Sequence, residues 1–258
     1  MRVYLYILLS ALLGLPPFRP IEQSLEERMT GGADGVEGAL VRISAARLSF
    51  LFLGFCRRVV VEVRGLRFKG LRTEAFRIEI EGLRLRPFQT FIMNRARVRG
   101  ADSVTWSITL RDEDLEAYIR SKGPPAAGVQ VRFAPEGVTL HRPAGLASLF
   151  SLTETFTLCA RLRVNRRKDL YLEMDHLSAF GFSPGRIFAR AISTIVNPVI
   201  EAKAISGLLA SNEIEVLENL APYTTLENIT LETGKAMVKG AVELHPCAPK
   251  KECTAEGG

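Results

Sequence analysis

Residues 59–86 read VVVEVRGLRFKGLRTEAFRIEIEGLRLR, a stretch in which apolar and charged side chains alternate. In an extended chain, this alternation places the apolar side chains on one face and the charged ones on the other. Gly65 and Gly82 each shift the alternation by one residue, as a β-bulge does. The stretch therefore predicts half-buried antiparallel strands, and the two shifts favour a curved sheet.

The same alternation recurs along most of the chain. It predicts further strands over residues 104–110, 129–133, 138–140, 156–164, 170–174, 229–231 and 238–242. Pro135-Glu136-Gly137 stands between two of these runs and predicts a hairpin turn. The short spacing between the runs is typical of antiparallel neighbours.

Three segments have helical spacing: residues 21–29, 112–122 and the long stretch from Pro184 to Leu209. Thr109 and Asp112 resemble a capping box at the start of the second. In the third, Ser183 is a suitable N-cap, Pro184 a suitable first residue, and Pro198 predicts a kink or a break. Its wide apolar stripe indicates burial, against a core or against an apolar ligand. We therefore expect an α+β protein.

Composition identifies a globular chain of 258 residues with a formal net charge of +6. The excess of positive charge is concentrated between Arg57 and Arg99. A basic stretch of this kind suits acidic lipid head groups, nucleic acid or an acidic polymer. It is equally explained as the solvated face of a half-buried sheet.

The N-terminus has an apolar run, residues 3–15, ended by Pro16 and Pro17. It is too short to span a bilayer as a helix and fits the core of a signal peptide. With no Ala-x-Ala site evident, an uncleaved anchor is the alternative, and a buried first element is another. We expect residues 1–20 to be this leader or anchor, 21–245 one domain, and 246–258 a polar tail.

Two cysteines, Cys247 and Cys253, lie in that tail. Export favours a disulfide between them, free thiols are the alternative, and a metal site with His245 matches no zinc spacing. Cys56 and Cys159 fall in expected strands and are interpreted as core thiols.

One motif imitates a catalytic site. Gly181-Phe182-Ser183-Pro184-Gly185 matches the G-x-S-x-G nucleophile elbow. The elbow needs a backbone N–H on the residue after the serine, and proline has none. The three histidines are scattered, and we find no phosphate loop or dinucleotide fingerprint. We therefore expect no enzymatic activity and no cofactor.

Four segments, in order, resemble the LmeA family of bacterial phospholipid-binding proteins. They are residues 49–55 before the valine strand, 109–119, 183–200 with its Asn197–Pro198 pair, and 220–240. The resemblance covers roughly residues 21–244. It implies an exported, non-enzymatic lipid binder in which a curved sheet wraps around a long, kinked apolar helix.

Under this implication, acyl chains lie between the sheet and the helix. The candidate lipid-binding residues are Phe50, Phe52, Leu53, Phe55, Ile187, Phe188, Ile192, Ile195 and Val196. Arg57 and Arg58 directly follow the first apolar segment and are the candidates for the head group. The expected partners are a phospholipid, preferably anionic, and a membrane surface in the cell envelope, with no nucleic acid. The alternatives are a basic envelope protein that binds an anionic polymer or nucleic acid, and a structural envelope protein that holds a partner.

Overall fold

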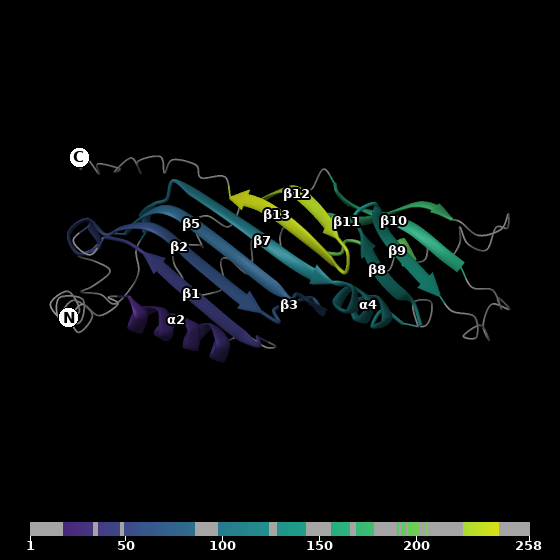
Figure 1. Ribbon diagram of the computed structural model, residues 1–258, viewed down its shortest axis with the longest axis horizontal. Coiled ribbons are helices and arrows are strands. Elements are labelled where there is room, and N and C mark those ends of the chain that lie inside the picture. Colours follow the sequence, from purple (N-terminus) through teal and green to yellow (C-terminus); the bar gives the residue numbers. More distant parts are fainter. Residues whose placement is uncertain are drawn as a thin grey trace, which may run out of the picture.

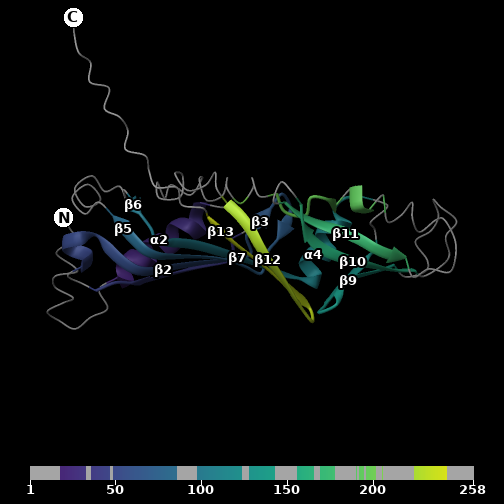
Figure 2. The ribbon, with the colours of Figure 1, turned by 90° about the horizontal axis from the view of Figure 1, so that it is seen from above.

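The computed structural model describes residues 18–32, 36–46, 49–85, 98–123, 128–142, 156–165, 169–177, 190, 192–194, 196–201, 205 and 224–242. These residues form an elongated molecule in which two antiparallel sheets follow each other along the long axis (Figure 1, Figure 2). The expectation of an α+β protein with mostly antiparallel sheet is confirmed.

The large sheet has seven strands in the order β1-β2-β5-β7-β13-β12, with β6 paired to β5. Their bounds are β1 Gly38–Ser44, β2 Phe55–Arg64, β5 Ala75–Leu85, β6 Val98–Gly100, β7 Ser103–Arg111, β12 Thr224–Glu232 and β13 Lys235–Val242. The sequence did not predict β1 or β6. Gly65 is not a bulge, because the chain turns there at φ +75° into a separate ribbon of β3 (Arg67–Phe68) and β4 (Leu71–Arg72).

The small sheet has four strands in the order β11-β10-β9-β8. They are β8 Gln130–Ala134, β9 Gly137–Arg142, β10 Phe156–Val164 and β11 Leu170–Leu177. The hairpin predicted around residues 135–137 is confirmed as the β8–β9 turn.

Each strand of the large sheet has one apolar and one polar side, as the alternation predicts. A row of paired residues crosses the apolar face through Val61, Ile78, Trp106 and Gly240. The charged residues that alternate with these apolar ones in the sequence lie on the opposite face. There, Arg58 and Arg77 both form ion pairs with Glu79. We call these the apolar face and the charged face of the large sheet.

Two of the three expected helices form as predicted, α2 (Arg19–Gly32) and α4 (Asp112–Arg120). The cap of α4 differs from the expectation: Arg111 is the N-cap, and its N–H donates to Asp114 at 3.4 Å.

The long kinked helix is not seen as one element. Residues 190, 192–194 and 196 are helical, the chain leaves the helix at 197–200, and much of 184–209 lies outside the described residues. The predicted break at Pro198 is thus observed.

Both helices cap the edge of a sheet with acidic side chains. Two of the backbone N–H groups of β1 that point away from the sheet donate to α2. The N–H of Val41 donates to Glu26 at 2.9 Å and that of Ile43 to Glu22 at 2.7 Å. Carboxylates therefore occupy these two outward donors, which an additional strand would otherwise use.

The edge of the small sheet repeats this arrangement. On β8 the N–H of Val131 donates to Glu116 at 3.0 Å and that of Phe133 to Asp112 at 2.7 Å. The sequence separations are the same as at β1, 15 and 21 residues. Burial raises the pKa of Asp112, and the hydrogen bond from Phe133 opposes that shift.

The repeated geometry corresponds to a repeated sequence. EQSLEERM at 22–29 aligns with DEDLEAYI at 112–119, and GALVRI at 38–43 aligns with GVQVRF at 128–133. Each helix then precedes antiparallel strands: β1, β2, β5 and β7 in the first unit, β8 to β11 in the second. The chain therefore contains two related helix-and-sheet units, followed by the β12–β13 hairpin, which pairs with β7.

An ionic cluster lies where α4, β4 and the start of β1 meet. Arg72 donates to both carboxylate oxygens of Glu37 at 3.0 and 2.8 Å, and to Asp114 at 2.8 Å. The Arg72 hydrogen bonds hold the pKa of Glu37 below its ordinary value. Asp114 is only 6% exposed. We call these three residues the junction cluster.

The cysteine expectations had different outcomes. Cys56 is buried, and burial raises the pKa of its thiol to about 12. Cys159 is exposed, so its interpretation as a core thiol was wrong. Its neighbours Ala160 and Leu162 are the buried residues of β10, and a register shift falls between Cys159 and Ala160. Cys247 and Cys253 lie outside the described residues.

Candidate functional site

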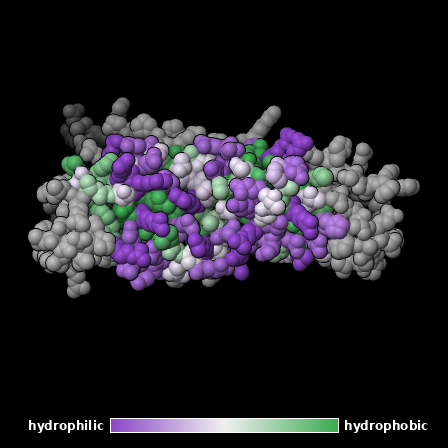
Figure 3. Space-filling model, in the orientation of Figure 1, coloured by the Kyte–Doolittle hydropathy of each residue, from purple (hydrophilic) through white to green (hydrophobic). Residues whose placement is uncertain are grey.

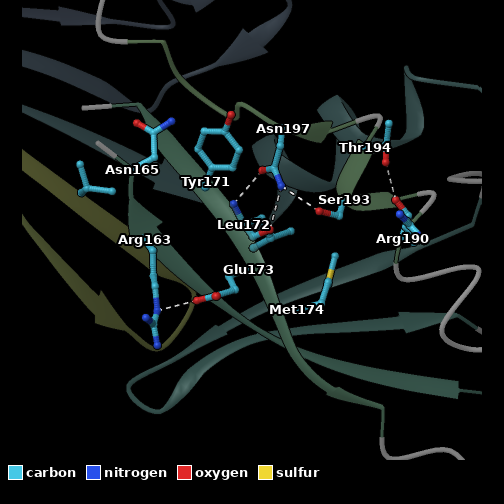
Figure 4. A pocket seen from close by; sticks show the side chains of 11 residues that line it. Arg163, Asn165, Tyr171, Leu172, Glu173, Met174, Arg190, Ser193, Thr194 and Asn197 are labelled. Carbon is cyan, nitrogen blue, oxygen red and sulfur yellow. Dashed lines mark hydrogen bonds and ion pairs between the residues drawn. The ribbon is translucent and has the colours of Figure 1, made fainter. Parts of the chain in front are cut away.

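An open groove of about 790 Å³ lies between β11 and the helical residues 190, 192–194 and 196 (Figure 4). Its walls come from the β10–β11 hairpin on one side and from the helical segment on the other. The residues that line it are Arg163, Val164, Asn165, Tyr171, Leu172, Glu173, Met174, Arg190, Ser193, Thr194 and Asn197.

Asn197 joins the two walls of the groove by hydrogen bonds. Its side-chain oxygen accepts the N–H of Leu172 at 2.7 Å, and its amide donates to the carbonyl of Leu172 at 2.9 Å and to Ser193 at 3.1 Å (Figure 4). Further backbone bonds join Leu170 to Ile200 at 2.8 Å and Val199 to Leu170 at 2.9 Å. The segment after the helix thus occupies the outer edge of β11.

The groove combines an apolar lining with charged groups. Val164, Tyr171 and Met174 contribute hydrocarbon surface. Arg163 is paired with Glu173 at 2.6 Å, whereas Arg190 is exposed and has no acidic partner among the described residues. Such a lining accommodates the hydrocarbon part of an amphiphile, and a free guanidinium at its margin can bind an anionic group.

The expected lipid-binding residues of the helix lie behind this wall. Ile192 and Val196 are fully buried in the core, and Ile187, Phe188 and Ile195 lie outside the described residues. The groove is lined instead by the polar positions of the same segment. These positions, which sequence reasoning did not select, recur at helical spacing: Arg190, Ser193, Thr194 and Asn197. A polar stripe on an otherwise apolar helix was the signal that could have identified them.

The expected residues of the Phe50–Phe55 segment are at the opposite end of the molecule (Figure 1, Figure 2). They form the turn η1 (Ser49–Leu53) and the start of β2. Phe50 is buried edge-to-face against Phe18, with ring centroids 5.1 Å apart. Leu53 is 70% exposed, Phe55 is half-buried, and the side chain of Phe52 lies outside the described residues. The structure therefore does not bring the two groups of candidates together.

The two head-group candidates are both exposed at the start of β2. Arg58 forms an ion pair with Glu79, whereas Arg57 has no ion pair among the described residues. Other arginines of the basic stretch also have acidic partners: Arg64 with Glu62, Arg72 with Glu37 and Asp114, Arg77 with Glu79, and Arg84 with Asp102. Figure 3, which looks onto the large sheet, shows mostly hydrophilic residues with smaller hydrophobic areas between them.

Two features are absent from the part of the chain that the structure describes. No group of three or more His, Cys, Asp and Glu side chains in this part of the chain is arranged to hold a metal ion. None of the helices described is long and apolar enough to cross a membrane. Ser183 of the G-x-S-x-G motif lies outside the described ranges.

Comparison with known proteins identifies a family. The model of the LmeA-like phospholipid-binding family matches residues 21–218. This range includes α2 from Ile21 onward, the strands and helix that follow it as far as β11, and every residue that lines the groove. No curated protein and no solved structure matches the chain.

Proposed function

Because the chain belongs to the LmeA-like phospholipid-binding family, we propose that it binds a phospholipid in the groove between β11 and residues 190–197, without changing it chemically. The observation that carries this placement is the position of Val164, Tyr171 and Met174 in the same groove as Arg190, which has no acidic partner among the described residues. Each buried methylene contributes about 0.8 kcal/mol to holding an acyl chain. Arg190 would bind the phosphate with paired hydrogen bonds, which favours an anionic lipid.

Filling the groove tests this placement. Thr194 is exposed and helical, and its hydroxyl donates to the carbonyl of Arg190 at 2.8 Å. We expect Thr194→Trp to reduce the phospholipid that co-purifies with the protein by about tenfold. The reason is that the indole would fill space otherwise occupied by roughly two or more methylenes of the bound acyl chain. The measurement is lipid extraction followed by quantitative mass spectrometry.

Thr30 offers a matched control at the other end of the molecule. It is also exposed on a helix, and its hydroxyl donates to the carbonyl of Glu26 at 3.0 Å. Thr30→Trp should leave the lipid content unchanged. Equal lipid in both variants would exclude the groove, and a wild-type protein that neither carries lipid nor takes it up from vesicles would refute phospholipid binding.

We further propose that the η1 end contacts the surface of an anionic membrane. Leu53 is exposed there, Arg57 is free of ion pairs among the described residues, and Phe18 packs on η1 just after the apolar run 3–15. An arginine near an anionic bilayer contributes about 1 kcal/mol. The apolar run is also our reason for placing the protein in the cell envelope, where the bound lipid would be transferred or kept from water.

Vesicle flotation tests the membrane contact. The combined change Leu53→Ser and Arg57→Gln should lower binding to anionic vesicles by about tenfold, and added salt should weaken wild-type binding. Arg67, another exposed arginine without an ion pair among the described residues, supplies the control Arg67→Gln. Equal loss in both variants would mean that no particular end faces the membrane. Strong, salt-sensitive binding to DNA without vesicle binding would favour the nucleic-acid alternative.

A further inference from the structure

Three charged side chains line the groove, and they are divided between its two walls. Arg163 and Glu173 belong to the β10–β11 hairpin, whereas Arg190 belongs to the facing helical segment (Figure 4). The Nε of Arg163 lies 2.6 Å from a carboxylate oxygen of Glu173, and Arg190 has no acidic partner among the described residues. Two guanidiniums and one carboxylate leave the lining with a net charge of +1.

The position of Glu173 follows from the register of the hairpin. Leu172 is fully buried, so the neighbouring side chains of Tyr171 and Glu173 are directed to the opposite side of β11. Across the hairpin, Tyr171 pairs with Arg163, and Glu173 pairs with Arg161, which does not line the groove. The carboxylate of Glu173 thus reaches diagonally to Arg163 and neutralises the guanidinium that the β10 wall contributes.

This charge distribution distinguishes two classes of phosphate group. A phosphodiester carries one negative charge, whereas a phosphomonoester carries close to two at pH 8. Arg190 can bind one phosphate with paired hydrogen bonds and balance one charge. A second charge would have to be balanced by Arg163, but Glu173 already occupies that guanidinium. Because Coulomb energy is proportional to the charge of the ligand, Glu173 opposes a phosphomonoester about twice as strongly as a phosphodiester.

We propose that Glu173 determines the head-group specificity of the groove, favouring phosphodiester lipids over phosphomonoester lipids such as phosphatidate. This inference rests on the proposed function, because it concerns the same groove and adds the class of lipid that it selects. Removing the carboxylate would release the guanidinium of Arg163 and raise the net charge of the lining from +1 to +2, which suits a doubly charged phosphate.

The test compares phosphatidate with phosphatidylmethanol of the same acyl chains, because the two lipids differ by one methyl group that removes the second ionisation. From an equimolar mixture at pH 8, the wild-type protein should retain the diester about fivefold in excess. Glu173→Gln should shift this ratio toward phosphatidate by about fivefold. The Glu173 side chain is 51% exposed, so an amide of nearly equal size leaves the fold intact. The measurement is lipid extraction followed by quantitative mass spectrometry.

Glu62→Gln is the matched control. Glu62 forms an ion pair with Arg64 at 3.1 Å on the large sheet, so this change alters the net charge of the protein equally but leaves the groove unchanged. It should keep the wild-type ratio. A ratio that Glu173→Gln does not shift, or that both variants shift alike, would overturn the role of Glu173 while leaving phospholipid binding intact. If the wild-type protein retained neither lipid, the proposed function would fail and this inference with it.

Discussion

Replacing Arg72 by alanine is expected to lower the free energy of unfolding by about 2 kcal/mol, because the buried Asp114 then loses its cation. Removing one partner of a fully buried pair costs about 3–5 kcal/mol, and the lower figure applies because the Arg72 side chain is 38% exposed to screening water. The measurement is urea unfolding at neutral pH. Arg67 lies directly across the ribbon from Arg72, and Arg67→Ala is the matched control.

The junction cluster also predicts which second change restores stability. Asp114→Asn removes the uncompensated charge but keeps an acceptor for the N–H of Arg111, so adding it to Arg72→Ala should recover part of the loss. The contribution of Glu37 depends on pH. Its pKa is held below the ordinary 4.5, so that contribution is present above pH 4.5 and is lost as the pH falls through the lowered pKa. If Arg72→Ala and Arg67→Ala were equally stable, the cluster would be an ordinary surface pair.

The strands of the large sheet could be predicted from the sequence because one face of the sheet is buried. Val59, Ile78 and Trp106 stand at alternate positions among polar residues, so the alternation itself reports which side faces the core. Strand β1 was missed because its alternation is short and because Arg42 is its single charged residue. The similarity between residues 38–43 and 128–133 could have predicted β1, since the alternation of residues 129–133 does predict a strand.

The candidate site was harder to predict, and the reason is visible in the helical segment. Apolar periodicity identifies residues that face the core, and Ile192 and Val196 are indeed buried. A groove on the surface is lined by the polar residues of the same segment. In the sequence, Arg190 and Asn197 look like ordinary solvent-facing residues, because no local pattern shows that β11 lies beside them. The hydrogen bonds between Asn197 and Leu172 span 25 residues, and no local pattern predicts them.

Removing both edge-capping carboxylates of α2 is expected to have the largest effect of the changes considered. Hydrogen bonds to charged acceptors contribute about 1.5–3 kcal/mol each, so Glu22→Ala with Glu26→Ala should cost about 3 kcal/mol. The uncovered N–H groups of Val41 and Ile43 would also form an edge open to pairing with another chain. We therefore expect a lower unfolding midpoint in urea, together with concentration-dependent association in light scattering.

Glutamine variants separate the hydrogen bond from other effects of truncation. Glu22→Gln with Glu26→Gln keeps an oxygen that accepts the strand N–H, so most of the stability should return and the association caused by the alanine changes should disappear. The second unit allows the same comparison with Asp112→Asn and Glu116→Gln, because Phe133 and Val131 occupy the positions of Ile43 and Val41. Alanine and glutamine pairs that behave alike at both edges would show that α2 and α4 hold their strands by apolar packing, with the carboxylates contributing nothing to the edge.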